Sequence, residues 1–274
     1  NDNNRALLII LDGVGVGPNT ENNGWTLAHT PNIDLLLNDY PSTTIQASGQ
    51  SVGLPSGQMG NSEVGHMVLG SGSIFKQDLV IINEAISNSK FFRNEAILNA
   101  ITSSKKKKND LHLLGLISFG GVHSHIDHLV AILKMCKAYG VSPKLHLFTD
   151  GRDADPKSAL GIFEYLNKYL IEYGGEIYTV SGRYYAMDRD QRWDRTELAW
   201  HAIVNNKGEK ANGFIDAIEN SYSKNTTDEF ILPTVLKGAK RLKKNDSLLF
   251  FNFRNDRTRQ IARALNVERF DNFK

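Results

Sequence analysis

Ser62 is the side chain in this 274-residue sequence whose surroundings best suit a nucleophile. It lies in the segment GNSEVGH (residues 60–66), where small residues flank a hydroxyl at the predicted start of a helix. A serine hydroxyl reacts slowly at neutral pH unless a base or a metal ion lowers its pKa. A serine at a helix start is also a common N-cap, so the position by itself leaves both interpretations open.

A carboxylate that suits a metal ion is predicted upstream of Ser62. The apolar run of residues 6–11 predicts a buried strand, and Asp12 and Gly13 follow it directly. Carboxylate oxygens are ligands that Mn²⁺ and Mg²⁺ prefer, so a metal ion held by Asp12 would activate the serine hydroxyl. An Asp-Gly pair after a strand also forms ordinary turns.

Strand-loop-helix units recur through the rest of the chain. Strands are predicted over residues 111–117, 144–148, 176–180 and 247–253, and each precedes a polar loop and a helical pattern. This alternation is typical of an α/β fold with parallel strands, and loops that follow parallel strands emerge at one edge of the sheet. Ligands of open α/β sheets bind at that edge.

These loops carry a second set of candidate site residues. The set combines an imidazole, several guanidinium groups and one carboxylate: His123, Arg152, Asp153, Arg183, Arg189, Arg254 and Arg257. The planar guanidinium group matches carboxylates and phosphates, so the set predicts a crevice for a small polyanion. Asp153 cannot attract an anion, and we expect it to accept a hydrogen bond from a substrate hydroxyl and to move its proton.

The segments LDG (residues 11–13) and LPSGQMGNSEVGH (residues 54–66), together with these loops, resemble cofactor-independent phosphoglycerate mutase, a metal-dependent family of the alkaline phosphatase superfamily. The resemblance implies interconversion of 3-phosphoglycerate and 2-phosphoglycerate in glycolysis and gluconeogenesis, through a phosphoserine at Ser62 and without 2,3-bisphosphoglycerate. It implies two Mn²⁺ or Mg²⁺ ions with Asp12 and Ser62 among their ligands, and catalytic roles for Ser62 and Asp153. The loop residues of the second set would bind the substrate.

The resemblance also implies two domains. Residues 1–75 correspond to the amino-terminal part of an alkaline-phosphatase-like metal domain. Residues 76–274 correspond to a transferase domain with a mainly parallel sheet, incomplete at its carboxyl end. Members of the family are longer, and their remaining metal ligands lie beyond Lys274. We therefore expect the chain to be inactive alone, and residues 1–75 to expose apolar surface.

Three other functions fit parts of the sequence. The segment HSHIDH (residues 123–128) has the spacing of metallo-β-lactamase-type zinc hydrolases, although only His146 and His201 remain as downstream histidines. A second alternative is another phosphomutase or phosphatase of the alkaline phosphatase superfamily. A third is an inactive fragment that binds anions.

Composition limits the partners and the compartment. A net charge of +2 gives no field that would recruit nucleic acid, and we interpret the lysine run at residues 105–108 as a solvated loop. The single cysteine, Cys136, excludes an internal disulfide and is predicted to be buried in a helix, which suits a reducing compartment. No apolar segment has the length of a membrane span, so we expect a cytoplasmic protein. We also expect a monomer whose partner is its small-molecule substrate.

Overall fold

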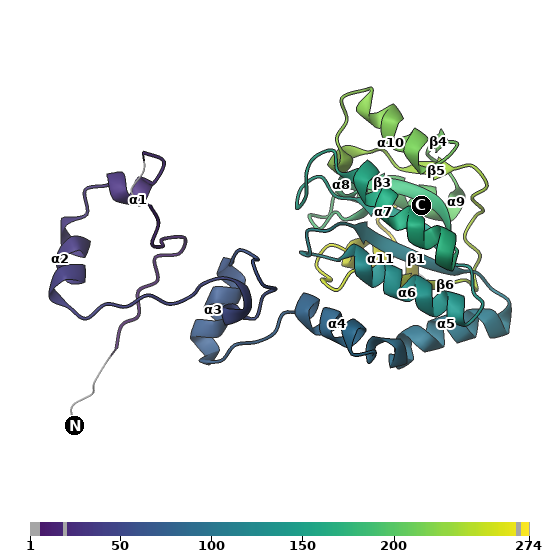
Figure 1. Ribbon diagram of the computed structural model, residues 1–274. Coiled ribbons are helices and arrows are strands. Elements are labelled where there is room, and N and C mark those ends of the chain that lie inside the picture. Colours follow the sequence, from purple (N-terminus) through teal and green to yellow (C-terminus); the bar gives the residue numbers. More distant parts are fainter. Residues whose placement is uncertain (1–5, 19–20, 267–269, 274) are drawn as a thin grey trace. The chain divides into compact units, whose positions relative to one another are not determined.

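The computed structural model describes residues 6–18, 21–266 and 270–273. The chain forms two compact units, Asn1–Gln77 and Asp78–Lys274 (Figure 1). None of the described helices is both long enough and apolar enough to cross a membrane.

The first unit consists of short helices. Its elements are α1 (Gly24–Leu27), α2 (Pro31–Asp39), the 3-10 helix η1 (Gly49–Val52) and α3 (Ser62–Ser71). Of these, η1 and α3 contribute side chains to a small core. Val52, Leu54 and Val64 are buried together, and Val68 packs against them. So few buried side chains contribute little hydrophobic stabilisation to this unit.

Residues 6–11 form no strand in the structure, so the predicted strand is wrong for this chain. A strand is stable only when its backbone N–H and C=O groups pair with a neighbour, and no described segment pairs with this one. Leu7 is 86% exposed and Ile9 is 71% exposed. These side chains confirm the expectation that the first unit presents apolar surface.

The second unit is built on one six-stranded sheet. Its strands are β1 (Leu111–Ile117), β2 (Lys144–Thr149), β3 (Glu176–Gly182), β4 (Glu209–Ala211), β5 (Thr234–Leu236) and β6 (Ser247–Phe250). The strand order is β4-β5-β3-β2-β1-β6, and only the β3 and β5 pair is antiparallel. The predicted α/β class with a mainly parallel sheet is therefore confirmed.

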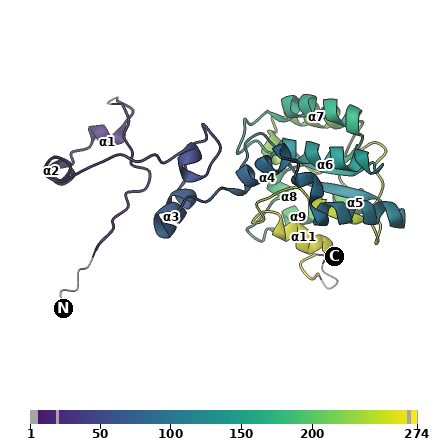
Figure 2. The same cartoon turned by 60° about the horizontal axis from the view of Figure 1, so that its bottom comes forward.

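Helices cover both faces of this sheet (Figures 1 and 2). The core of one face includes side chains from α5 (Glu95–Lys107), α6 (Ile126–Ala138), α7 (Ala159–Tyr173) and α10 (Phe214–Tyr222). The core of the other face includes side chains from α8 (Arg183–Ala186), α9 (Trp193–Asn205) and α11 (Arg259–Asn266). The remaining elements are α4 (Asp78–Ser87), η2 (Phe91–Arg93) and η3 (Asp228–Phe230).

Strand β1 shows why the sheet needs both layers. Successive strand side chains point to opposite faces, so Leu113 packs in the core with α6 and α7, whereas Leu114 packs in the core with α9. Every residue of β1 is buried. A strand covered on both faces is mostly apolar along its length, and in β1 His112 is the exception.

The lysine run and the end of β6 differ from the sequence prediction, and β2 and β3 extend one and two residues beyond the predicted strands. Lys105, Lys106 and Lys107 form the last turn of α5 rather than a loop, because the helix dipole favours cations at that end. Strand β6 ends at Phe250 rather than at residue 253. The chain leaves the sheet there because the N–H groups of Phe253 and Arg254 donate to the carbonyl oxygen of His123, at 3.0 and 3.3 Å.

The strand order reverses its direction at β1. From β1 the chain winds through α6 and α7 to β2 and β3 on one side, and it returns as β6 on the other side of β1. The loops after β1 and β6 therefore diverge around a topological switch point, which is where doubly wound sheets bind ligands. The bonds from Phe253 and Arg254 to His123 hold these two loops together.

Asp228 fixes the loop that follows β2 from a distant part of the chain. It is fully buried, and its Oδ2 accepts the N–H groups of Ser158 and Ala159 at 2.8 and 2.9 Å. Ser158 stands at the N-cap of α7 but makes no side-chain cap bond, so Asp228 caps this helix instead. Its Oδ1 accepts the hydroxyl of Tyr222.

We expect Asp228→Ala to lower the free energy of unfolding by about 2–3 kcal/mol, because buried donors lose their acceptor. Asp155→Ala removes an exposed carboxylate from the same loop and should change it by less than about 0.5 kcal/mol. Urea unfolding followed by tryptophan fluorescence measures both variants. Equal losses of unfolding free energy in Asp228→Ala and Asp155→Ala would contradict the role of Asp228 as the cap of α7.

Candidate functional site

Arg183 is buried at the centre of the loops that follow β2 and β3. Its side chain is 2% exposed, and its Nη1 donates to Asp150 Oδ1 at 2.6 Å and also to Asp153 Oδ2. Asp150 also accepts the hydroxyl of Ser118 at 2.6 Å and the N–H of Asp153 at 3.0 Å. The Arg183 guanidinium group and its partner Asp150 therefore join the loops after β1, β2 and β3.

Sequence reasoning missed Asp150, although it directly follows β2 and precedes the predicted Arg152 and Asp153. Burial alone would raise the pKa of the Asp150 carboxyl. The hydrogen bonds from Ser118, from the Asp153 N–H and from Arg183 outweigh burial and lower that pKa below its ordinary value. A charged residue directly after a buried strand was the available signal.

Gly151 lets the loop after β2 turn sharply. Its φ of +68° lies in the left-handed region, and a Cβ there would lie 2.7 Å from the backbone nitrogen of Glu229. Arg152 follows, and its Nη1 lies 3.3 Å from Glu229 Oε1. The Arg152 side chain is 58% exposed, so this ion pair is worth little stability and leaves the guanidinium accessible.

His123 lies between two carboxylates and is buried. Its Nε2 is 3.7 Å from Asp153 Oδ2, and its Nδ1 is 3.4 Å from Asp256 Oδ1. Burial and the positive charge of Arg183 lower the pKa of His123 to about 4, although both carboxylates oppose this shift. The imidazole is therefore neutral at pH 7.

Asp256 connects His123 to two of the predicted arginines. Its Oδ2 accepts Nη1 of Arg189 at 2.8 Å, and Nε of Arg254 lies 3.3 Å from its Oδ1. Burial opposes ionisation of Asp256, but Arg189 and Arg254 outweigh it, so its pKa is lowered. Sequence reasoning missed this residue, which stands between Arg254 and Arg257 in the same loop.

Arg257 completes the group. Burial lowers the pKa of Arg257, and the positive charges of Arg183, Arg189 and Arg152 lower it further. The predicted residues that the structure brings together are His123, Arg152, Asp153, Arg183, Arg189, Arg254 and Arg257. Their arginines outnumber the carboxylates among them, so the region favours an anion.

Several polar atoms of this region are buried without a hydrogen-bond partner. They are His123 Nδ1, Asp256 Oδ1 and Arg257 Nε. Buried polar atoms are nearly always paired in native proteins, and unpaired ones indicate a missing water, ion or ligand. Their concentration in these loops singles out the region as a place where a polar ligand would be stabilised.

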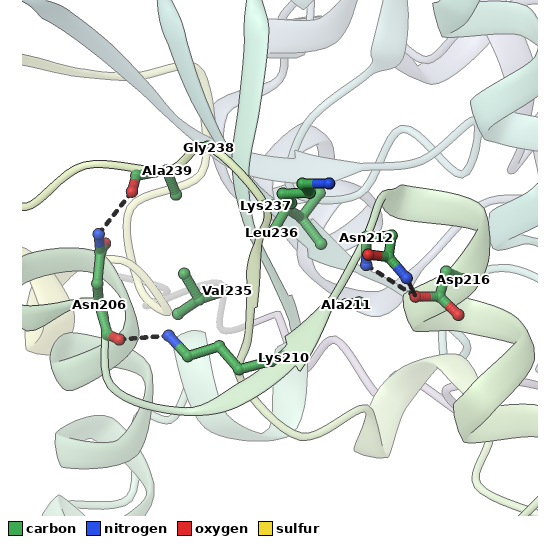
Figure 3. Close-up of a pocket in the computed structure, with 10 residues that line it drawn as sticks. All are labelled: Asn206, Lys210, Ala211, Asn212, Asp216, Val235, Leu236, Lys237, Gly238 and Ala239. Atoms are coloured by element: carbon green, nitrogen blue, oxygen red, sulfur yellow. Dashed lines mark hydrogen bonds between the residues drawn. The ribbon is translucent and has the colours of Figure 1, made fainter.

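The hollow beside β4 and β5 lies apart from these residues. This hollow of about 520 Å³ is lined by residues such as Lys210 and Asp216, and none of the predicted site residues lines it (Figure 3). Its polar groups are paired locally, for example Lys210 Nζ with the Asn206 carbonyl at 2.6 Å. A hollow of about 350 Å³ does border Arg189 and Asp256.

In the first unit, Ser62 is the first residue of α3 and its side chain is exposed. Asn61 is the N-cap, because its side chain accepts the N–H of Val64 at 3.0 Å, so the serine hydroxyl is not used for capping. Its Oγ lies 3.2 Å from His66 Nδ1. That nitrogen is also 2.8 Å from the Ser62 carbonyl oxygen, so it carries hydrogen and cannot act as a base toward the hydroxyl.

Asp12 is exposed in a turn of the same unit. A carboxylate and a hydroxyl are oxygen donors of the kind that Mn²⁺ and Mg²⁺ take, so their chemistry fits these ions. Within the described part of the chain, the metal-ligating side chains that approach one another closely are Asp110, His112 and Asp246. They already form a paired cluster: Asp246 accepts the N–H of Asp110, and Lys243 lies 3.6 Å from the Asp110 carboxylate.

The zinc-hydrolase spacing at residues 123–128 does not produce a metal site among the described residues. His125 caps α6 by accepting the N–H of Asp127, and His128 Nε2 contacts Asn83 at 2.8 Å. His123 instead faces Asp153 and Asp256. His146 is fully within β2, as predicted for a strand residue.

Fold and site together define a doubly wound α/β protein with arginine-rich loops at the carboxyl ends of its strands. The sequence matches the family model "BPG-independent PGAM N-terminus" over residues 82–274. The chain therefore belongs to the family of 2,3-bisphosphoglycerate-independent phosphoglycerate mutases, as the sequence resemblance implied.

Individual relatives agree with this assignment. The chain is 52% identical to the 2,3-bisphosphoglycerate-independent phosphoglycerate mutase of Clostridium novyi and 53% identical to that of Clostridioides difficile. These alignments cover 98% and 97% of this chain but 54% and 53% of those proteins. A crystal structure of Leishmania mexicana phosphoglycerate mutase at low cobalt concentration superposes with a TM-score of 0.82 and 30% identity, over 96% of this chain and 51% of that one. The chain thus spans about half the length of the relatives it matches.

The lowered pKa of Asp150 predicts acid sensitivity. A carboxyl whose pKa is lower in the folded state contributes stability above its unfolded pKa, about 4, and that stability is lost as the pH falls through the folded value. We expect unfolding free energy to fall below about pH 4. Asp150→Ala should cost about 3–5 kcal/mol at pH 7, because Arg183 loses a buried partner, and should flatten this acid dependence.

Chemical unfolding between pH 3 and 7 tests this expectation. Asp190→Ala removes an exposed carboxylate from the neighbouring loop after β3 and serves as the control. If the unfolding free energies of Asp150→Ala and Asp190→Ala fell equally as the pH is lowered, Asp150 would not be the cause of the acid sensitivity.

Proposed function

We propose that this chain supplies the phosphorylated serine and the substrate-binding residues of an enzyme that interconverts 3-phosphoglycerate and 2-phosphoglycerate in glycolysis and gluconeogenesis. The observation that carries the proposal is the gathering of arginines from the loops after β2, β3 and β6 around His123 and Asp153. A phosphoglycerate carries a phosphate and a carboxylate, and clustered guanidinium groups suit both. The family membership supports the same reaction.

The chain's residues would divide the work in the following way. Ser62 attacks the phosphorus of 3-phosphoglycerate, so that the bond to Ser62 Oγ forms while the bond from phosphorus to the 3-oxygen breaks. Asp153 gives that oxygen a proton, and it leaves as the 3-hydroxyl of glycerate. Glycerate stays in the arginine crevice and then accepts the group on its 2-hydroxyl. Asp153 accepts the hydroxyl proton during this second step and returns it in the reverse direction. The crevice must retain glycerate, because water at this stage would hydrolyse the phosphoserine.

Ser62 needs activation from outside its own helix. His66 is the nearest base, but its Nδ1 carries hydrogen toward the Ser62 carbonyl oxygen. Asp12 and Ser62 would be ligands of Mn²⁺ or Mg²⁺, which lowers the pKa of a bound hydroxyl when present. Two ligands do not hold such an ion against water, so the site also requires donors other than these two side chains.

We also propose that the two domains have different functions. Residues 1–75 would belong to the metal-binding, phosphatase-like domain, and residues 76–274 to the transferase domain that binds substrate. The buried, unreactive Cys136, whose pKa burial raises to about 12, suits a reducing cytoplasm. We expect the enzyme to act there as a monomer.

Calorimetry and turnover assays test the proposed function together. In the complete enzyme, Ser62→Ala should lower turnover on the order of 10⁴-fold or more while leaving the Kd for 3-phosphoglycerate within about twofold. Arg257→Ala should weaken binding by about 10- to 100-fold, since it removes a charge-assisted contact. Arg241→Ala, at an exposed site, is the matched control and should leave both unchanged.

Mutase activity that survives Ser62→Ala would contradict the phosphoserine. Equal affinities of Arg257→Ala and Arg241→Ala would contradict the crevice as the binding site.

A further inference from the structure

We propose that Asp256 is a positioning residue of this site: it holds His123 as the Nδ1–H tautomer, so that the Nε2 lone pair faces Asp153 and the substrate. The inference rests on the proposed function for its catalytic meaning. The tautomer itself is a property of the unliganded protein.

Asp256 sits where the two halves of the sheet separate. Its loop follows β6 and is bonded to the loop after β1 through the carbonyl oxygen of His123. From this place its carboxylate contacts the His123 ring through Oδ1 and Arg189 through Oδ2. It therefore touches side chains from the loops after β1 and β3 while belonging to a third loop.

The unpaired atoms determine the direction of the contact. His123 Nδ1 and Asp256 Oδ1 are both buried without a hydrogen-bond partner, and they lie 3.4 Å apart. A shift of a few tenths of an ångström would place them at hydrogen-bond distance. An ionised carboxylate can only accept hydrogen bonds, so the hydrogen between the two atoms must be on Nδ1. The opposite tautomer would direct a lone pair at the carboxylate and leave Nδ1 unsatisfied, while Oδ1 would keep only its 3.3 Å contact with Arg254 Nε.

Asp153 does not compete effectively for the imidazole hydrogen. Its Oδ2 lies farther from the ring, at 3.7 Å from Nε2, and already accepts a hydrogen bond from the buried Arg183. Nε2 is consequently the free lone pair of a neutral ring. It can accept a hydrogen bond from a hydroxyl but cannot donate one to a phosphate oxygen.

This arrangement gives His123 a distinct task in an arginine-rich crevice. The arginines bind phosphate and carboxylate groups, whereas a neutral acceptor beside Asp153 recognises an O–H group. In the proposed reaction that group is the glycerate hydroxyl, which must be aligned before Asp153 takes its proton. Asp256 would act through His123 and Arg189 without itself touching substrate, in the way that outer residues orient a catalytic imidazole.

The Asp256 carboxylate is not needed to hold the backbone of its own loop. The N–H groups of Thr258 and Arg259 both donate to the carbonyl oxygen of Asn255, at 3.2 Å each. Arg257 Nη1 contacts the carbonyl oxygen of Met187. The turn is thus closed by atoms other than the Asp256 carboxylate.

Nitrogen-15 NMR of the histidine rings tests the tautomer directly at pH 7, on the unliganded protein. We expect His123 to show a protonated Nδ1 and an unprotonated Nε2 in the wild type and in Asp190→Ala, which removes an exposed carboxylate beside Arg189. Asp256→Ala should shift the ring toward the Nε2–H tautomer. A wild-type ring with hydrogen on Nε2, or a ring unchanged in Asp256→Ala, would overturn the inference.

Kinetics of the complete enzyme test the consequence. Asp256→Ala should lower kcat by about 10- to 100-fold and raise KM, because it misplaces His123 and releases Arg189. Asp256→Asn keeps an oxygen acceptor for Nδ1–H and should recover most of kcat while KM stays raised. Its tautomer remains measurable if Asp256→Ala fails to fold. Equal kcat values for Asp256→Ala and Asp190→Ala would also overturn the inference.

The pH profile separates positioning from a change of charge. The charged groups that face His123 are Arg183, Asp256, Asp153 and Arg254. Removal of Asp256 takes away one of the carboxylates that raise the His123 pKa, so the ring stays neutral and the kcat loss should be the same from pH 6 to 8. A loss that disappears within this range would contradict positioning. Wild-type protein that shows the expected tautomer but no affinity for 3-phosphoglycerate would instead refute the proposed function.

Discussion

The buried contact of Arg183 with Asp150 and Asp153 is the constraint on which the site depends. All three side chains come from the carboxyl ends of β2 and β3, and Arg183 and Asp150 are almost wholly removed from water. A buried charge is tolerated only when its partners are in place, because an unpaired one costs several kcal/mol. The loops must therefore adopt the conformation that brings these groups together. The positions of Arg152 and His123 follow from that conformation.

The same contact divides the arginines into two kinds. Arg183 is neutralised by carboxylates and serves mainly to shape the loops. Arg152 and Arg189 are about half exposed, and Arg257 is crowded by the positive charges of its neighbours. Crowded cations raise the free energy of the empty site, and an anion relieves that repulsion. The geometry thus favours a ligand with more than one negative group, and the neutral His123 adds a position that prefers a hydroxyl.

The two units differ in how far this chain alone can stabilise them. The second unit buries side chains on both faces of its sheet and has an extended core. The first unit has few buried side chains, and its exposed run at residues 6–11 lacks a partner strand. The proposed nucleophile Ser62 and the proposed ligand Asp12 both belong to this less consolidated unit. Catalysis would therefore require more structure than these residues provide, whereas anion binding requires mainly the second unit.

The sequence by itself determined four strands of the second unit and the helices that follow them, together with the set of loop residues that suggested an anion site. Buried strands covered on both faces are mostly apolar, as in β1, and arginines after such strands indicated an anion crevice at one sheet edge. The motifs around Asp12 and Ser62 indicated the family. Only the tertiary structure showed that Asp228 caps α7 and that Asp150 and Asp256 organise the arginines. These contacts join residues far apart in sequence, and no local pattern reports which distant carboxylate faces a given guanidinium. The strand expected at residues 6–11 failed for the same physical reason, since a strand exists only when a neighbour supplies its hydrogen bonds.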